Sequence, residues 1–123
     1  MNYKIVIDPG HGGDDPGASG NGIIEKDLNL KISNYMYDQF RKLGIPVKLT
    51  RTTDETVSPT ERTQRILDAF GNNNDIIVIS NHINSGGSDI SNYEGLYLKN
   101  YLIISLKTSI YLLSCVLNPN LYL

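Results

Sequence analysis

Two runs of apolar, largely β-branched residues stand out, one at the start of the chain and one in its second half. Tyr3–Ile7 ends on a turn-forming Asp8–Gly10 segment, and Asp75–Ser80 follows a polar stretch at 71–74. Both runs are apolar on either face, which is typical of strands buried inside a parallel sheet. A third strand is predicted at Val47–Arg51, between two segments with helical periodicity.

The first helical segment spans residues 27–43, where apolar side chains recur at every fourth position. These positions are Leu28, Ile32, Met36 and Phe40, with Leu43 near the next step. The spacing predicts an amphipathic helix that buries this stripe against a sheet. Asp27 is expected to cap its amino end, and Gly44 and Pro46 are expected to end it.

The second helical segment has the clearest start signal in the chain. Ser58 stands at the expected N-cap, Pro59 at the first helical position and Glu61 at the third, which is the arrangement of a capping box. Gly71 is expected to end this helix. Three apolar residues are expected to form its buried face: Ile66, Leu67 and Phe70.

The predicted elements alternate in the order β-α-β-α-β. Because crossovers between parallel strands are right-handed, this order predicts an α/β fold of three layers, a mostly parallel twisted sheet with helices on both faces. The length of 123 residues lies in the range of one hydrophobic core, so a single domain is predicted over residues 1–123.

The only two histidines of the chain lie where predicted strands end. His11 follows the first strand, inside the glycine-rich Asp8–Gly13 segment, and His82 follows the strand that ends at Ser80. Open α/β sheets bind ligands at the carboxyl ends of their strands, so both imidazoles are expected at one edge. With Glu25 they form a two-histidine, one-glutamate set, which suits a hydrolytic zinc site with an open fourth position.

Each of these residues also has a plainer interpretation. His11 is compatible with a turn histidine or with a backbone nest that binds an anion, although no phosphate-binding glycine motif is present. His82 is compatible with a capped strand end, and Glu25 with a solvated loop before a helix. Asp8 is a candidate to orient His11 as a hydrogen-bond acceptor, but a turn is the commoner use of Asp-Pro-Gly.

Four segments together resemble a known enzyme family. They are Asp8–Gly13, Gly22–Leu30, Leu49–Arg51 and Ser80–Asn84. In their order and spacing, residues 3–98 resemble the zinc-dependent N-acetylmuramoyl-L-alanine amidases of the Amidase_3 type. The resemblance implies that His11, Glu25 and His82 bind one zinc ion. It also implies that the substrate is peptidoglycan, hydrolysed at the amide between the lactyl group of N-acetylmuramic acid and the first L-alanine of the stem peptide.

The general base departs from the family pattern. Related amidases carry a catalytic glutamate on a late strand, whereas residues 95–123 contain no aspartate or glutamate. Glu94 is the only late glutamate and therefore the candidate base, with a strand-edge carboxylate as the alternative role. Arg51 and Asn84 are candidate substrate contacts, because an arginine fork suits carboxylates and an amide can donate to substrate carbonyls.

The segment 101–123 differs in composition from the rest of the chain. It is rich in Leu, Ile, Tyr, Ser and Asn, and Lys107 is its only charged residue. One interpretation is a truncated or frameshifted gene whose native carboxyl-terminal third has been replaced. The other is a buried helix around Ile103–Val116 that covers the sheet. No stable membrane insertion is predicted, because Lys107 and Asn118–Pro119 interrupt the apolar stretch.

Charge and composition narrow the class of partner. The net charge is −2 and no Lys/Arg run is present, which argues against a nucleic-acid role. The single cysteine, Cys115, excludes an internal disulfide and a cysteine-based zinc motif.

The start of the chain bears on where the protein acts. No signal peptide is recognisable before the first strand, so the chain is expected to be made in the cytoplasm. It would act at the cell wall after lysis, or as part of a longer secreted protein. Two functions from other classes stay open: a catalytically inactive remnant that binds zinc or muropeptide, and a zinc peptidase acting on stem peptides.

Overall fold

The computed structural model describes residues 3–20, 22–71, 75–83, 93–98 and 101–108, the last two ranges through their backbone. Its main sheet has five strands in the order β4-β1-β5-β7-β6. They are β1 (Lys4–Pro9), β4 (Val47–Leu49), β5 (Ile76–Ile83), β6 (Tyr93–Leu98) and β7 (Tyr101–Thr108). Strands β4, β1, β5 and β7 are parallel, and β6 pairs antiparallel with β7 at one edge. The predicted mostly parallel sheet is confirmed.

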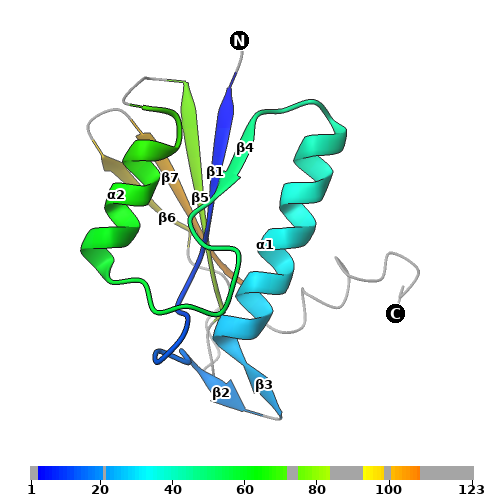
Figure 1. Cartoon of the computed structure of the whole chain (residues 1–123), viewed down its shortest axis with the longest axis vertical. Coiled ribbons are helices and arrows are strands. Elements are labelled where there is room, and N and C mark those ends of the chain that lie inside the picture. The colour runs from blue at the N-terminus through cyan, green and yellow to red at the C-terminus, as the bar shows by residue number, and fades with distance from the viewer. Residues whose placement is uncertain (1–2, 21, 72–74, 84–92, 99–100, 109–123) are drawn as a thin grey trace.

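Two helices cover the sheet from opposite sides, α1 (Glu25–Lys42) on one face and α2 (Pro59–Phe70) on the other (Figure 1). Successive side chains of β1 point to opposite faces of the sheet, so they belong to two separate apolar clusters. The cluster under α2 contains Val6, Ile66, Ile76 and Val78. The cluster under α1 contains Ile5, Ile7, Val47 and Ile79. The molecule is therefore the three-layer α/β fold that the order of elements predicts.

Helix α2 begins and ends as its sequence predicts. The Ser58 side chain accepts a hydrogen bond from the backbone N–H of Glu61 at 3.2 Å, and Pro59 is the first helical residue. Gly71 ends the helix with φ 73°. Ile66 is buried, and Leu67 and Phe70 pack against its cluster. The Glu61 carboxylate pairs with the Arg65 guanidinium one turn later.

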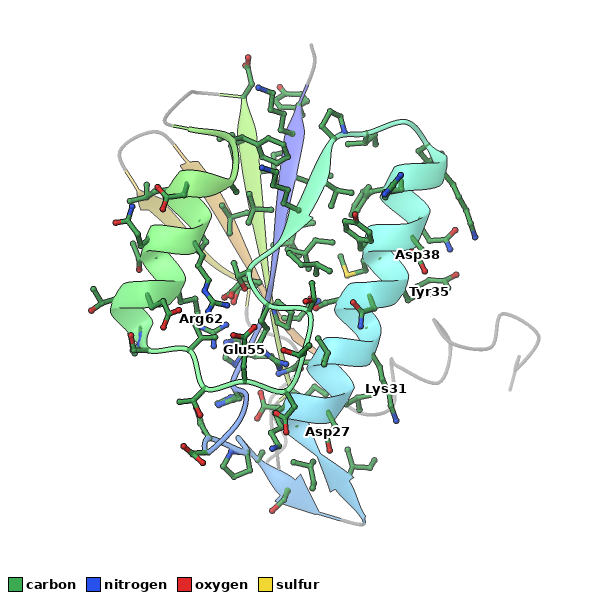
Figure 2. All side chains as sticks on the ribbon, in the orientation of Figure 1. Asp27, Lys31, Tyr35, Asp38, Glu55 and Arg62 are labelled. Carbon is green, nitrogen blue, oxygen red and sulfur yellow. The ribbon has the colours of Figure 1, made fainter. Side chains whose placement is uncertain are left out.

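Helix α1 differs from the sequence prediction in its start and in its buried face. It begins at Glu25, with Ile24 at the N-cap and no side-chain cap, so the prediction of Asp27 as the cap is wrong. Asp27 lies on the outer side of the helix with Lys31 and Asp38 (Figure 2). The buried residues of α1 are Glu25, Asn29 and Ser33.

The predicted apolar stripe is therefore not the most deeply buried face of α1. Met36 and Phe40 do pack against the apolar cluster under the helix. Leu28 and Ile32 are only half-buried, and Leu43 is 72 % exposed, beyond the helix end. This difference arises because the helix places polar side chains against the carboxyl ends of the strands.

The later part of the chain adds strands. Residues 101–108 form β7, so a helix beginning at Ile103 is wrong for these residues, and 109–116 lie outside the described part. A two-stranded hairpin, β2 (Ser19–Gly20) with β3 (Ile23–Ile24), precedes α1. Among the described residues, no helix combines the length and apolar character that crossing a bilayer requires.

Candidate metal centre

His11 stands in the loop that leaves β1, where the backbone takes an unusual conformation. Its φ is 59°, in the left-handed region that non-glycine residues seldom adopt. At the preceding Gly10, a Cβ atom would lie 2.5 Å from Cε1 of His82 and 2.6 Å from the carbonyl oxygen of Asn81. The loop therefore passes directly against the end of β5, and the two imidazole rings meet edge to face with centroids 4.9 Å apart.

Glu25 is the first residue of α1, and its carboxylate is held between two backbone N–H groups. Oε2 accepts from Ala18 at 2.8 Å, and Oε1 accepts from Ile83, the last residue of β5, at 2.8 Å. The side chain is 5 % exposed, so the alternative of a solvated loop glutamate is wrong. The carboxylate joins the start of α1 to the carboxyl end of β5.

The side chains of His11, Glu25 and His82 converge on one point. His11 Nε2 lies 3.1 Å from Glu25 Oε1, and His82 Nδ1 lies 3.3 Å from the same oxygen. The two nitrogens are 3.2 Å apart. Nitrogen and oxygen ligands of a tetrahedral zinc ion lie about 3.4 Å from one another, given zinc–ligand distances of about 2.0–2.2 Å. The triangle has the size of one face of such a tetrahedron, so these three residues can hold one metal ion.

The carboxylate beside Nδ1 of His11 belongs to Asp15 and not to Asp8. Asp15 Oδ2 lies 2.8 Å from Nδ1 of His11, and its Oδ1 accepts the backbone N–H of Gly17 at 3.1 Å. A carboxylate at one imidazole nitrogen directs the lone pair of the other nitrogen toward a metal and fixes the ring orientation. Asp15 therefore lies where a residue that orients His11 must lie, and Asp8, the sequence-based candidate, does not.

Asp8 lies at the end of β1 and has partners of its own. Its Oδ1 accepts from Thr50 and from Arg62, each at 2.6 Å, and its Oδ2 accepts from Ser80 at 3.1 Å. Arg62 reaches from α2 (Figure 2) and also donates to the carbonyl oxygen of His11 at 3.1 Å. The buried Asp8 carboxylate thus ties the β1 end to β5 and α2.

The pKa values of Glu25 and His82 are both shifted in the direction that favours metal binding. Burial raises the pKa of Glu25, but the N–H groups of Ala18 and Ile83, with His11 and Asn29, outweigh it and lower the pKa below its ordinary value. Burial and the neighbouring His11 lower the pKa of His82. A carboxylate and a neutral imidazole are the forms that ligate metals, so both shifts favour metal binding by these two side chains.

Arg51 occupies a different place from the substrate contact expected of it. Its side chain is 2 % exposed and donates to four backbone carbonyls. These belong to Pro9, Gly10, Lys26 and Thr53, at 2.9 to 3.2 Å. The guanidinium therefore fastens the loop before His11 to the start of α1. This burial argues against direct contact between Arg51 and a substrate carboxylate.

The other two candidates from the sequence are Asn84 and Glu94. Asn84 lies outside the described residues. Glu94 lies in β6, where its backbone pairs with Ser105 of β7, which in turn pairs with Ser80 of β5. Two strand spacings, about 10 Å, separate the Glu94 backbone from β5. The roles of Asn84 and Glu94 stay predictions.

Sequence reasoning missed two residues of the site, Asp15 and Asn29. Asn29 is fully buried, and its Nδ2 faces Oε1 of Glu25 at 3.4 Å. Both residues stand four positions after a candidate ligand, Asp15 after His11 and Asn29 after Glu25. On a helix this spacing places two side chains on one face, so the position of Asn29 four residues after Glu25 was the signal that predicts it beside Glu25. In a glycine-rich loop it has no fixed meaning, which explains why Asp15 was overlooked.

Comparisons with known families and proteins show which family the chain belongs to. Residues 5–106 match the model of the Amidase_3 family, described as N-acetylmuramoyl-L-alanine amidase, and the match extends into β7. The chain is 37 % identical over 97 residues to the uncharacterized protein YqiI of Bacillus subtilis, covering 79 % of this chain and 45 % of that protein. It is 43 % identical over 88 residues to the sporulation-specific N-acetylmuramoyl-L-alanine amidase of Bacillus subtilis, covering 68 % of this chain and 32 % of that one. The chain thus spans less than half the length of these relatives.

Solved structures give the same family likeness. The N-acetylmuramoyl-L-alanine amidase AmiC2 of Nostoc punctiforme aligns with a TM-score of 0.61 and 32 % identity, over 72 % of this chain and 48 % of that one. The N-acetylmuramoyl-L-alanine amidase from Clostridium difficile 630 aligns with a TM-score of 0.63 and 30 % identity, over 80 % and 54 %.

Proposed function

The chain belongs to the N-acetylmuramoyl-L-alanine amidase family Amidase_3, and from this premise we propose that it is a zinc-dependent amidase of bacterial peptidoglycan. The bond hydrolysed is the amide between the lactyl group of N-acetylmuramic acid and the first L-alanine of the stem peptide. One zinc ion is the cofactor, bound by His11, Glu25 and His82.

The observation that carries the proposal is the ligand triangle at the carboxyl edge of the sheet. Its sides of 3.1, 3.2 and 3.3 Å match the spacing of three nitrogen and oxygen ligands around one tetrahedral ion. The donor set of two imidazoles and one carboxylate is common in hydrolytic zinc sites, where the fourth position is left to water or substrate. Both the spacing and the chemistry of the residues present therefore fit zinc.

Each ligand is prepared by its own contacts. Asp15 orients the His11 ring, and the N–H groups of Ala18 and Ile83 hold the Glu25 carboxylate. When bound, zinc supplies Lewis-acid chemistry, polarising a scissile carbonyl and making water more acidic. The protein contributes a fixed three-ligand face with one side open.

A general base must still accept the proton of the attacking water and return it to the leaving amine. We assign this role to Glu94, the only glutamate after His82, and a substrate-binding role to Asn84. Arg51 is assigned to holding the ligand loop, in keeping with its four carbonyl contacts. Glu94→Gln tests the base: it should lower the rate of cleavage by at least about 100-fold without changing zinc affinity.

The proposed place of action is the cell wall, reached after lysis or as part of a longer secreted protein. The direct test is digestion of purified peptidoglycan with added zinc and, in parallel, with a chelator, followed by mass spectrometry of the products. Zinc-dependent release of stem peptides with a free L-alanine amine is the expected result. Release of fragments cut within the stem would identify a zinc peptidase instead.

One observation favours a second candidate function. Residues 95–123 contain no aspartate or glutamate, so the late catalytic glutamate of related amidases has no counterpart there. A chain that keeps the three ligands without that base would bind zinc or muropeptide without cleaving it. A folded, zinc-loaded chain that retains muropeptide and releases no product would establish this second function.

A further inference from the structure

The buried face of α1 changes character along the helix. Glu25, Asn29 and Ser33 follow one another at intervals of four residues and are 5, 0 and 0 % exposed. In the second half of the helix, Met36, Tyr37 and Phe40 pack against the apolar cluster instead, and these three side chains are half-buried. The most deeply buried line of α1 is therefore polar, and it lies beside the ligand triangle. Burying polar groups costs free energy unless they are hydrogen-bonded, so each of them needs an account.

Asn29 bridges the two segments that carry His11 and Glu25. Its Nδ2 lies 3.3 Å from the carbonyl oxygen of Gly10, the residue before His11. The same nitrogen lies 3.4 Å from Oε1 of Glu25, the oxygen that faces both imidazoles. One amide group thus touches the loop of one ligand and the side chain of another.

The orientation of this amide is determined by its surroundings. Turning it over would place Oδ1 against two acceptors, the Gly10 carbonyl and the Glu25 carboxylate. In the observed orientation Oδ1 has no hydrogen-bond partner among the described residues. A buried carbonyl without a partner is costly, and a leucine of similar size would avoid that cost. What the asparagine supplies, and leucine would not, is the pair of N–H contacts.

Ser33 makes the corresponding link to β5. Its Oγ accepts a hydrogen bond from Nδ2 of Asn81 at 2.7 Å, and Asn81 directly precedes His82. The carbonyl oxygen of Asn81 in turn accepts the backbone N–H of Gly10 at 2.9 Å. Two consecutive turns of α1 are therefore tied to the two strand ends from which the histidines project.

We propose that Asn29 is a positioning residue of the metal centre, holding Glu25 in register with His11 through the Gly10 carbonyl, and that Ser33 supports His82 through Asn81. This inference rests on the metal site proposed above. The apolar half of α1 sets how strongly the helix packs. The polar half sets where along the strands the Glu25 carboxylate lies, because sliding the helix would leave several buried donors and acceptors unpaired.

The test compares Asn29→Ala with Asn34→Ala in the full chain. Asn34 is an exposed residue of the same helix, so both changes raise helix propensity equally and only Asn29→Ala removes the contacts to Gly10 and Glu25. Zinc affinity is measured by competition with a chromophoric chelator, and Tm is measured for the metal-free proteins. Asn29→Ala should bind zinc about 10-fold or more weakly, as is typical when a residue supporting a ligand is lost. Asn34→Ala should bind as the wild type does.

A second readout separates positioning from folding. With Co²⁺ at saturation, the visible spectrum reports ligand geometry, and Asn29→Ala should change its intensity while Asn34→Ala should not. If Asn29→Ala does not fold without metal, Ser33→Ala decides the matter, with an expected loss of several-fold in zinc affinity.

The outcomes distinguish this inference from the proposed function. A wild-type chain that binds no zinc overturns the metal site, and the positioning role with it. Zinc binding by the wild type with equal affinity and an equal Co²⁺ spectrum in a folded Asn29→Ala overturns the positioning role alone. Equal weakening in Asn34→Ala also overturns it, since the contacts of Asn29 would then not be the cause.

Discussion

The two helices begin in different ways. Helix α2 starts from a local signal, with the Ser58 side chain capping the N–H of Glu61 and Pro59 preset for the first turn. Helix α1 has Ile24 at its N-cap and no side chain to cap it. Its first two N–H groups, from Glu25 and Lys26, donate to the carbonyls of Ala18 and Pro16 at 2.9 and 3.1 Å.

This difference shows how the proposed metal ligand Glu25 and the start of α1 depend on one another. Glu25 and Ala18 exchange two bonds: the Glu25 N–H donates to the Ala18 carbonyl, and the Ala18 N–H donates to Glu25 Oε2. The loop that caps α1 is thus the same loop that holds the ligand carboxylate. Gly17 makes this possible, because a Cβ atom there would lie 2.6 Å from the His11 ring and 2.7 Å from Glu25 Oε2. Local capping builds α2, whereas long-range contacts at the site build the start of α1.

The largest effect is expected from removing the charge of the glutamate at the start of α1. Glu25→Gln keeps the size of the side chain but replaces the proposed carboxylate ligand by an amide, so zinc affinity should fall by at least about 100-fold, and the proposed amidase activity with it. The matched control is Glu61→Gln, in the first turn of α2, which should leave zinc affinity unchanged. Isothermal titration with zinc measures both. Wild-type affinity in Glu25→Gln would remove this residue from the ligand set.

The next effect concerns the loop that joins His11 to α1. Asp15→Asn removes the carboxylate from His11 Nδ1 while keeping the shape of the side chain, and zinc affinity should fall by about 10-fold. Asp14→Asn serves as the control, because Asp14 is also exposed in the same loop but contacts Thr56. Chelator competition on both variants measures the difference. Equal affinities would mean that Asp15 does not orient the ring.

A smaller effect is expected at the start of α2, and on a different property. Ser58→Ala removes the side-chain cap and should lower the free energy of unfolding by about 1 kcal/mol. Zinc affinity should not change, since α2 supplies no ligand. Urea unfolding with chelator present measures the first and zinc titration the second. Weaker zinc binding in this variant would show that the two helix starts are coupled after all.

The smallest effect is expected from the exposed ion pair between Lys26, in the first turn of α1, and Asp54. Hydrogen bonds from the Lys26 ammonium and from the Gly13 N–H lower the pKa of Asp54 below its ordinary 3.8. The unfolded chain therefore binds the proton more readily, and the contribution of Asp54 to stability is complete above 3.8 and lost as the pH falls through the lower folded value. Asp54→Asn should have a slightly lower Tm than the wild type near pH 6, and this gap should close in more acidic buffer. A gap that widens on acidification would contradict the direction of the pKa shift.

Sequence patterns predicted several strands and helices correctly, because these elements are determined by residues only a few positions apart. The apolar runs at 3–7 and 75–80 became β1 and β5, and Ser58 began α2. The resemblance to the amidase family is confirmed by the match over residues 5–106. The prediction of Asp27 as the N-cap was wrong. The first N–H groups of α1 donate to loop carbonyls instead of a side-chain cap, and these carbonyls lie close to the helix only in the folded chain.

The sequence by itself determined the three parallel strands β1, β4 and β5 and the two helices between them. It also placed one histidine near the carboxyl end of each of two strands that can share one edge, although His82 lies within β5 and not after it. Periodicity, caps and turn residues act over a few positions, so they can be recognised without knowing the fold. Only the tertiary structure decided that Asp15 and not Asp8 lies beside His11, and that Arg51 is buried under the ligand loop. It also decided that the polar line of α1, and not its apolar stripe, is most deeply buried. These outcomes depend on contacts between segments far apart in the chain, where each buried polar group must find its partner.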